Sequence, residues 1–278
     1  MRLPCFKSLS LRVYDKLAKN LEIISMKNQL IELIVKRLNE SKEQLKKDFL
    51  TEHPIQISRY FVLDNLLPKE LAEQIYASFP NPKKMHLLTS FGKIKLKYNH
   101  LKDSAKLLQD LNAAIQDPQV VAVIEEITGV KNQIPDPTRF AGGISTLLKG
   151  YYINPHLDNS HDVEMKRYYR TMNVLYYVSP NWRIENGGNY ELWDEAVNQH
   201  ILVPSLFNRM LVMETNSRSW HAVNPVLCDS PRCCIFNYYF SEQSPEGVDY
   251  FFDAPSFRPR PEQKFLRAIG RLKATFIR

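Results

Sequence analysis

The sequence predicts an α+β fold in which helices precede a sandwich or jelly roll of short β-strands. In the first third of the chain, apolar residues recur at helical spacing within a charged background. From about 144 to 241 the chain instead carries short runs of aromatic and β-branched residues, which favour strands. Turn signals such as Asn186-Gly187-Gly188 separate these runs. Many short strands with tight turns are typical of sandwiches and jelly rolls, and the preceding helices would cover one sheet.

Four helices are expected before the strand-rich region. A second helix follows Pro68, which suits the first turn of a helix. Asp103 or Ser104 is expected to cap a third, and Asp117 and Gly129 to begin and end a fourth. The first helix is expected from its apolar residues at helical spacing, which are Leu30, Ile34, Leu38, Leu45 and Phe49.

Strand candidates lie both between these helices and after the proline-bearing stretch IPDPTRF. The early candidates are 57–63 and 93–97, and the later ones are 171–178, 187–193, 199–203, 209–215 and 232–240. After Pro261 the chain is expected to turn helical again. That last segment is basic, because residues 256–278 carry seven Lys or Arg against one acidic residue. We interpret it as a solvated basic face, and no signature of nucleic-acid binding accompanies it.

The bulk properties favour one catalytic domain with an appendage in a reducing compartment. The chain has 278 residues, of which 44% are hydrophobic and 24% charged. No run of about 18 apolar residues suggests a membrane span, and no apolar run of signal-peptide type opens the chain. A cytoplasmic location without a membrane partner is therefore expected. The four cysteines form no CxxC pair and no disulfide framework, which favours reduced thiols.

His156, Asp158 and His221 form the most informative pattern of the chain. His156 and Asp158 are separated by one residue, so on an extended strand their side chains point to the same face. His221 follows 63 positions after Asp158 and must arrive from another strand. Two imidazoles and one carboxylate can occupy one face of an octahedral iron and leave three positions open for a cosubstrate and dioxygen. Zinc is the competing metal, since hydrolases also hold it with such ligands.

Arg232 favours iron over zinc as the expected metal. It follows His221 by eleven positions and opens an otherwise apolar strand, where an unpaired buried charge would be costly. Its guanidinium can grip a carboxylate through two parallel hydrogen bonds. A 2-oxoglutarate molecule that chelates iron through its 2-oxo and C1 carboxylate oxygens would project its C5 carboxylate toward such an arginine. Zinc chemistry does not explain this residue.

These residues resemble the prolyl-4-hydroxylase-type Fe(II)/2-oxoglutarate-dependent oxygenases. The matching segments are PHLDNS, TMNVLYYVSPNWRIENGGNYELWD, NRMLVMETNSRSWHAVNPV and PRCCIFNYYF. The resemblance implies a double-stranded β-helix core (jelly roll or cupin-like) at about 143–241, with N-terminal supporting helices. It also implies iron on His156, Asp158 and His221, and 2-oxoglutarate on Arg232. We expect a helical appendage at 1–55 and an oxygenase domain at 56–278 that ends in the basic helix.

Further positions follow from the resemblance alone. In the family, a tyrosine on the strand after the HxD motif often adds a hydroxyl to the C5 carboxylate site. Tyr176 aligns best with that position, with Tyr177 on the opposite face, and Tyr152 is a further candidate for the cosubstrate pocket. Ascorbate is a further candidate cofactor. One departure is Phe236, which stands where relatives often carry a hydroxyl donor.

The expected reaction couples decarboxylation of 2-oxoglutarate to oxidation of a second substrate by dioxygen. Hydroxylation of an unactivated C–H bond is the default outcome, and no residue decides against desaturation or ring closure. We favour a small or carrier-bound biosynthetic substrate, because nothing marks a peptide-binding domain. A prolyl or other side chain of a protein is the alternative. A non-catalytic cupin-like ligand binder and a zinc hydrolase are alternatives from other classes, and the oligomeric state stays open.

Overall fold

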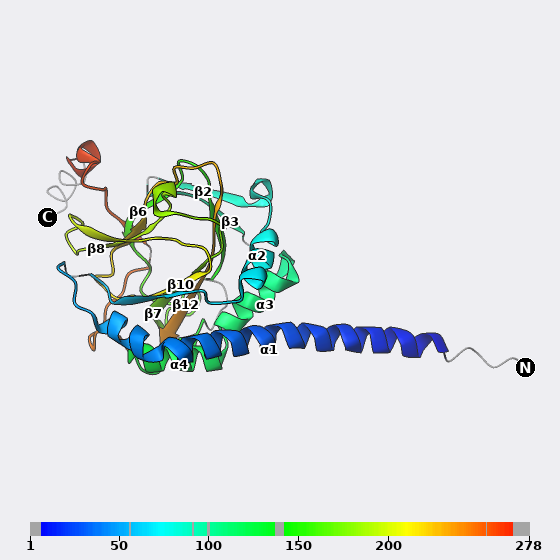
Figure 1. The fold of residues 1–278 in the computed structure, drawn as a ribbon. Helices are drawn as coiled ribbons and strands as arrows, with labels where there is room; N and C mark the ends of the chain where they lie inside the picture. The colour runs from blue at the N-terminus through cyan, green and yellow to red at the C-terminus, as the bar shows by residue number, and fades with distance from the viewer. Residues whose placement is uncertain are drawn as a thin grey trace, which may run out of the picture.

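The computed structural model describes residues 7–55, 57–90, 92–98, 101–136, 142–253 and 255–268, with side chains from Met26 onward. Four α-helices precede most of the strands, as Figure 1 shows in blue to green. They are α1 (Lys7–Leu50), α2 (Lys69–Ala77), α3 (Lys106–Ile115) and α4 (Pro118–Thr128). The prediction of four helices in this part of the chain is confirmed.

The helix ends agree with the sequence in one case and differ in another. Asp117 caps α4 by accepting a hydrogen bond from the backbone N–H of Gln119, and Gly129 ends it at a φ of 72°. The cap expected for α3 was wrong. Ala105 is its N-cap residue, and the hydroxyl of Ser104 instead donates 2.6 Å to the backbone carbonyl of Leu101 in the preceding turn.

Within the described residues the strands form one continuous antiparallel sheet of 13 strands. Along its main path the order is β1-β10-β7-β12-β5-β3-β6-β11-β8-β9, with β13 on β6, β2 on β3 and β4 on β12. The strands are β1 (Tyr60–Asp64), β2 (His86–Ser90), β3 (Lys93–Tyr98), β4 (Ile134–Pro135), β5 (Gly143–Leu147), β6 (Tyr152–Leu157), β7 (Tyr169–Tyr177), β8 (Tyr190–Trp193), β9 (His200–Val203), β10 (Arg209–Glu214), β11 (His221–Val223), β12 (Arg232–Ser241) and β13 (Ser256–Phe257).

The sheet curls so that its two halves face each other. Residues from β5, β7, β10 and β12 pack against residues from β8, β9 and β11 in one cluster, which we call the inner cluster. Its members include Leu147, Tyr177, Tyr190, Cys234 and Phe236. Strand β3 joins the halves, since it pairs with β5 at one end and β6 at the other. This arrangement is a double-stranded β-helix core and confirms the predicted fold class.

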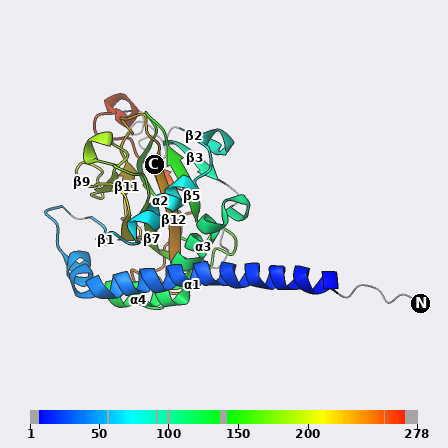
Figure 2. The ribbon, with the colours of Figure 1, turned by 45° about the vertical axis from the view of Figure 1, so that its right-hand side comes forward.

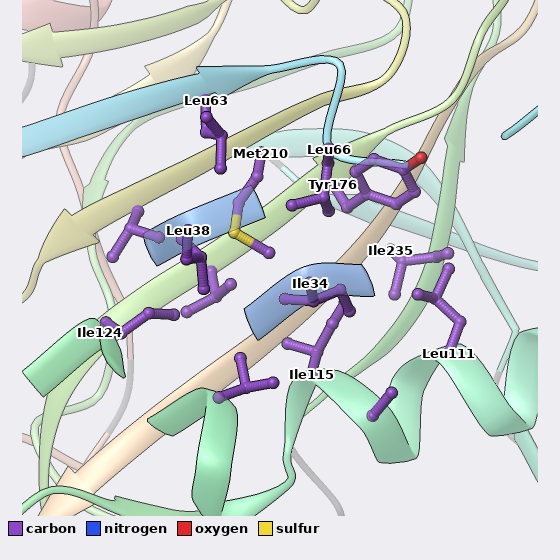
Figure 3. Packing of buried hydrophobic residues seen from close by; sticks show 14 of the residues in the cluster. Ile34, Leu38, Leu63, Leu66, Leu111, Ile115, Ile124, Tyr176, Met210 and Ile235 are labelled. Atoms are coloured by element: carbon purple, nitrogen blue, oxygen red, sulfur yellow. The ribbon is translucent and has the colours of Figure 1, made fainter. Parts of the chain in front are cut away.

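Helices cover the outer face of one half of the sheet. The C-terminal half of α1 and α4 lie side by side beneath β7, β10 and β12, and the two views agree on this (Figures 1 and 2). Figure 3 shows Ile34 and Leu38 of α1 packed with Ile115, Ile124 and Met210. Alternate residues of β12 serve the two faces, because Ile235 lies in this helix-covered core and Cys234 in the inner cluster.

The C-terminal segment differs from the expected solvated basic face. Strand β13 pairs with β6. Arg260 is only 6% exposed, and its Nη1 lies 2.6 Å from Oε2 of the buried Glu191. Arg258 stacks on Trp220, with Cζ 4.1 Å from the ring centroid. Residues 264–268 are helical, and the rest of the predicted basic helix lies outside the described residues.

Two further findings concern bulk expectations. None of the described helices combines the length and the apolar character that a membrane crossing requires. Cys228, Cys233 and Cys234 are free thiols, and the last two are buried in β12 as predicted. The division at residue 55 stays a prediction, although Leu45 and Phe49 of α1 belong to the same core as Phe61 of β1.

Candidate functional site

His156, Asp158 and His221 meet at one point of the curled sheet. His156 lies on β6 and His221 on β11, and the two residues are direct partners in the antiparallel register. Asp158 follows the last residue of β6. Its Oδ1 lies 3.7 Å from Nε2 of His156, and its Oδ2 lies 3.7 Å from Nε2 of His221. The three ligand atoms all fall within 4.8 Å of one another, which is the spacing of a metal site.

Backbone carbonyls fix the orientation of both imidazoles. Nδ1 of His156 lies 3.0 Å from the carbonyl oxygen of Asn154, and Nδ1 of His221 lies 2.8 Å from that of Ser219. Each Nδ1–H therefore donates to a carbonyl, which leaves the lone pair on Nε2 directed at Asp158. Tyr190 stacks on His221 with ring centroids 5.4 Å apart and holds that ring from the inner cluster.

The electrostatics of the cluster keep its groups in metal-binding protonation states. Burial, aided by the charge of His221, lowers the pKa of His156 to about 3, and burial also lowers the pKa of His221. Burial alone would raise the pKa of Asp158, but Arg170 and the two histidines outweigh it and lower that pKa. Neutral imidazoles and an ionised carboxylate are the forms that bind a cation.

Arg170 is a component of this site that the sequence did not identify. Its Nη1 lies 3.1 Å from Oδ2 of Asp158, and its Nη2 donates 2.9 Å to Oδ1 of Asn159. The guanidinium lies over the ring of Tyr238, with Cζ 3.8 Å from the centroid. The backbone N–H of Arg170 donates 2.8 Å to the carbonyl of Ser160, and this bond brings Arg170 beside Asp158.

Arg232 lies on the inner wall, in a pocket that two glycines shape. It is 2% exposed, and its Nε donates 3.1 Å to the carbonyl of Gly188 while its Nη2 lies 3.3 Å from Oγ of Ser205. A Cβ on Gly188 would lie 3.2 Å from Cγ of Arg232, and one on Gly187 would lie 2.0 Å from the carbonyl oxygen of Pro225. Both glycines have positive φ, so this turn needs glycine for its backbone and for its space.

The structure does not bring Tyr176 to this pocket. Tyr176 lies in the helix-covered core, where Figure 3 shows it beside Leu66, and its hydroxyl donates 2.7 Å to Oδ1 of Asn208. Tyr177 faces the inner cluster instead, and Cζ of Arg232 lies 4.6 Å from its ring centroid. The family tyrosine is therefore matched in space by Tyr177. Tyr176 and Tyr177 face opposite sides of β7, and the prediction from the sequence chose the tyrosine that faces away from Arg232.

Tyr152 also lies away from the inner wall. It precedes Ile153 on β6, and Ile153 packs against the inner cluster. Neighbouring residues on a strand face opposite sides, so Tyr152 points to the other face of β6. An irregularity between β6 and β11 then lets His156 share the inner face three residues later. A strict count of alternation from His156 would have placed Tyr152 inside.

The residues present fit an iron ion and 2-oxoglutarate. Oδ2 of Asp158 is buried without a hydrogen bond of normal geometry in the described residues, as expected of an atom that holds a cation. The hydroxyl of Tyr177 lies near Ser205, but it makes no hydrogen bond of normal length and angle with the residues that the structure describes. It stands beside the buried guanidinium of Arg232, and together they offer hydrogen bonds to a carboxylate. Two imidazoles and one carboxylate suit ferrous iron with open positions.

Comparisons with known proteins agree with this reading. The model of the 2OG-Fe(II) oxygenase superfamily matches residues 143–240. A prolyl-4-hydroxylase from Pseudomonas putida superposes with a TM-score of 0.51 at 14% identity, covering 71% of this chain and 97% of that one. A structure of prolyl 4-hydroxylase from Phytophthora capsici also gives a TM-score of 0.51 at 14% identity, covering 88% of this chain and 75% of that one. No curated protein matches the chain.

The fold, the site geometry and the family model all indicate an oxygenase that uses iron(II) and 2-oxoglutarate. At these identities the two solved structures show a shared fold, whereas the family model also covers β6, β11 and the start of β12, which carry His156, His221 and Arg232. The alternatives of a cupin-like binder and a zinc hydrolase explain neither the family match nor the buried arginine. Residues 143–240 thus match the 2OG-Fe(II) oxygenase superfamily, and the chain is an enzyme with a double-stranded β-helix core that uses iron(II) and 2-oxoglutarate.

Proposed function

We propose that this enzyme hydroxylates an unactivated C–H bond of a small or carrier-bound biosynthetic substrate. In this proposal His156, Asp158 and His221 hold the iron, and Arg232 with Tyr177 binds the C5 carboxylate of 2-oxoglutarate. The convergence of two imidazoles and a carboxylate within 4.8 Å on the wall that also carries the buried Arg232 is the observation that carries it. When bound, iron and 2-oxoglutarate supply the activation of dioxygen and the oxidising equivalents of the reaction.

The residues of the chain orient these groups and keep water away. The carbonyls of Asn154 and Ser219 fix the two imidazoles, so that Nε2 of each is ready to bind without rearrangement. Arg170 pairs with Oδ2 of Asp158 and keeps this carboxylate ionised. Phe257 stacks on His156 with ring centroids 5.2 Å apart and closes the edge of the site.

The C5 carboxylate site depends on preorganisation of Arg232. The carbonyl of Gly188 and the hydroxyl of Ser205 hold the guanidinium in place before any ligand arrives. Burial raises the pKa of Tyr177, so its hydroxyl stays protonated and can donate a hydrogen bond to a carboxylate. A buried, charge-assisted pair of this kind binds a dicarboxylate far more tightly than an exposed lysine would.

A protein substrate is the second candidate. It is supported by the fold shared with two prolyl 4-hydroxylases, although identities of 14% extend only to the fold. We favour the small or carrier-bound substrate, because an inward-facing row of lysines on β3 beside the metal site suits an acidic small molecule.

Turnover with product detection tests the proposal. The purified protein with Fe(II), ascorbate and 2-oxoglutarate should convert 2-oxoglutarate to succinate slowly alone and faster with the right substrate, whose product gains one oxygen atom by mass spectrometry. Asp158→Ala and His221→Ala should abolish succinate formation, whereas Asp229→Ala, at an exposed acidic residue paired with Lys149, should not. Succinate formation that survives Asp158→Ala would contradict the assignment of the iron ligands.

A further inference from the structure

A row of three lysines lines the wall next to the metal site. Lys93, Lys95 and Lys97 alternate along β3, so their side chains share one face of the strand. That face is the inner one, since Lys93 pairs in register with Ile153, which packs against the inner cluster, while the intervening Leu96 belongs to the helix-covered core. Strands β2 and β3 pair as a hairpin that presents these cations to the site.

The ammonium groups reach the rings that border the iron ligands. Nζ of Lys95 lies 5.3 Å and Nζ of Lys97 5.7 Å from the ring centroid of Phe236. Nζ of Lys93 lies 5.8 Å from the ring centroid of Phe257, the residue that stacks on His156. Phe236 stands where relatives often place a hydroxyl donor, so this enzyme replaces a polar contact with an aromatic platform for cations.

Lys95 is the lysine nearest to the chemistry. Its charge acts on the pKa values of His156, Asp158 and His221 together. Its own pKa is lowered to about 8, first by burial and then by repulsion from Lys93, with Asp158 opposing the shift. A partly buried ammonium ion with two like charges beside it weakens the fold unless an anion joins it.

Lys93 and Lys95 have no matching negative charge among the described residues. Neither Lys93 nor Lys95 makes an ion pair within the part of the chain that the structure describes, and the carboxylate closest in effect, Asp158, is already paired with Arg170. Iron(II), Arg170 and Arg232 more than balance the charges of Asp158 and a 2-oxoglutarate dianion, so the cosubstrate brings no spare negative charge. Lys93 and Lys95 therefore stay in excess after the cosubstrate has bound.

We propose that Lys93, Lys95 and Lys97 bind a phosphate or carboxylate group of the primary substrate and thereby select an acidic small molecule. This rests on the proposed function, since it deepens the substrate class of the same site. Lysines two positions apart on a strand lie about 7 Å apart at Cα, and their four-carbon stems let them converge on one tetrahedral dianion. Their position inside the curled sheet suits a single anionic group at the end of a small molecule.

A series of probes with one ring and different charge tests this binding. The probes are phenyl phosphate, phenylacetate and benzyl alcohol, titrated by calorimetry into the protein loaded with Mn(II) and 2-oxoglutarate without oxygen. Phenyl phosphate should bind at least tenfold more tightly than benzyl alcohol, and its affinity should fall as salt rises. Tighter binding of phenylacetate than of phenyl phosphate would identify a carboxylate as the natural group and equally support an anion site.

Lysine variants locate the site. Lys95→Met should weaken phenyl phosphate binding about tenfold, Lys93→Met and Lys97→Met about fivefold, and Lys95→Arg should restore most of the loss. Lys84→Met, at an exposed lysine before the same hairpin, is the matched control and should change nothing. Thermal melting of each variant checks that it is folded.

The outcomes separate this inference from the proposed function. Absence of 2-oxoglutarate binding by the metal-loaded protein would overturn the proposed function itself. Normal 2-oxoglutarate binding with equal affinity for phenyl phosphate and benzyl alcohol would overturn only the anion site. A loss of 2-oxoglutarate affinity in Lys95→Met, with no change for phenyl phosphate, would also overturn it, because the lysine would then serve the cosubstrate.

Discussion

Nη1 of Arg170 lies 3.1 Å from Oδ2 of Asp158, and this pair joins the strand β7 to the metal cluster of β6 and β11. Arg170 is 4% exposed and packed over Tyr238, so its position is fixed by the core and not by solvent. A carboxylate held from one side by a rigid cation presents its remaining lone pairs in one direction. The arrangement explains how a residue just beyond the end of a strand can serve as an ordered metal ligand.

Loss of this pair should weaken metal binding. Arg170→Met keeps the apolar stem but frees Asp158 to rotate, and iron affinity should fall about 10–100-fold. Titration of Fe(II) under anaerobic conditions measures the change. Arg167→Met, which removes an exposed ion pair with Glu242, is the control and should leave the affinity unaltered. An unchanged iron affinity in Arg170→Met would mean that Asp158 is positioned without its partner.

The two adjacent tyrosines of β7 should separate into different roles. Tyr177→Phe removes the hydroxyl beside Arg232 and should raise the KM for 2-oxoglutarate about five- to tenfold. Tyr176→Phe removes the 2.7 Å bond to Asn208 and should instead lower the free energy of unfolding by about 1 kcal/mol. Steady-state kinetics and urea unfolding on both variants make the comparison. A raised KM in Tyr176→Phe, with only a loss of stability in Tyr177→Phe, would show that Tyr176 serves the cosubstrate.

Arg232 should serve the cosubstrate and not the metal. Arg232→Ala removes a buried, charge-assisted partner and should weaken 2-oxoglutarate binding by at least about 30-fold while iron affinity stays unaltered. Calorimetric titration of 2-oxoglutarate into the Mn(II)-loaded variant measures this loss. Iron loss in place of cosubstrate loss would show that Arg232 supports the ligand cluster.

The turn at Gly187 should tolerate no side chain. Gly187→Ala places a Cβ 2.0 Å from the carbonyl oxygen of Pro225 at a φ of +69°, so the backbone must move, and the loss should be about 2–4 kcal/mol of unfolding free energy. Gly150 has a φ of +80° but open space around its Cβ position. Gly150→Ala should therefore cost only the backbone strain of about 1–2 kcal/mol. Equal losses in chemical denaturation would show that contact with Pro225 is unimportant.

Lys95 should make stability depend on alkaline pH. Its pKa is lowered to about 8 in the folded chain by burial and by Lys93, with Lys97 adding to the shift and Asp158 and Cys234 opposing it. The unfolded chain therefore binds more protons between about pH 8 and 10.5, and stability contributed by Lys95 rises with pH across that window. Below pH 8 the penalty is complete, so Lys95→Met should stabilise the protein at pH 7 by roughly 1–3 kcal/mol.

Chemical denaturation at pH 7 and pH 9.5 checks this prediction. The difference in unfolding free energy between Lys95→Met and the parent chain should shrink as pH rises, because the parent recovers the lost stability. Other titrating groups cancel in that difference. A gap that stays constant with pH would indicate that the ammonium group is well solvated in the folded state.

The metal ligands could be predicted from sequence because short-range spacing and chemistry fixed them. The HxD motif places His156 and Asp158 together locally, and the segment NRMLVMETNSRSWHAVNPV identified His221 through its resemblance to the family. The face of Tyr176 could not be predicted in the same way, since a one-residue shift of phase moves a side chain to the other side of a sheet. Pro155 is a local sign that β6 departs from regular alternation between Ile153 and His156, but it does not say which side chains change face.

Long-range pairing explains the other differences. Arg260 looked like part of a basic tail because its partner, Glu191, is 69 positions away in the chain. The alternation of Lys93, Lys95 and Lys97 is visible in the sequence, but its meaning depends on which face of β3 turns inward, and that follows from the register with β5 and β6.

An anaerobic spectroscopic titration tests the iron and cosubstrate site most directly. Fe(II) followed by 2-oxoglutarate should produce the weak visible charge-transfer band of a keto acid chelated to iron, and the band should saturate at one equivalent of iron per chain. Asp158→Ala should remove the band by losing iron, and Arg232→Ala should require far more 2-oxoglutarate to reach it. No band with the parent chain at saturating iron and 2-oxoglutarate would contradict the assignment of His156, Asp158, His221 and Arg232 to one shared site.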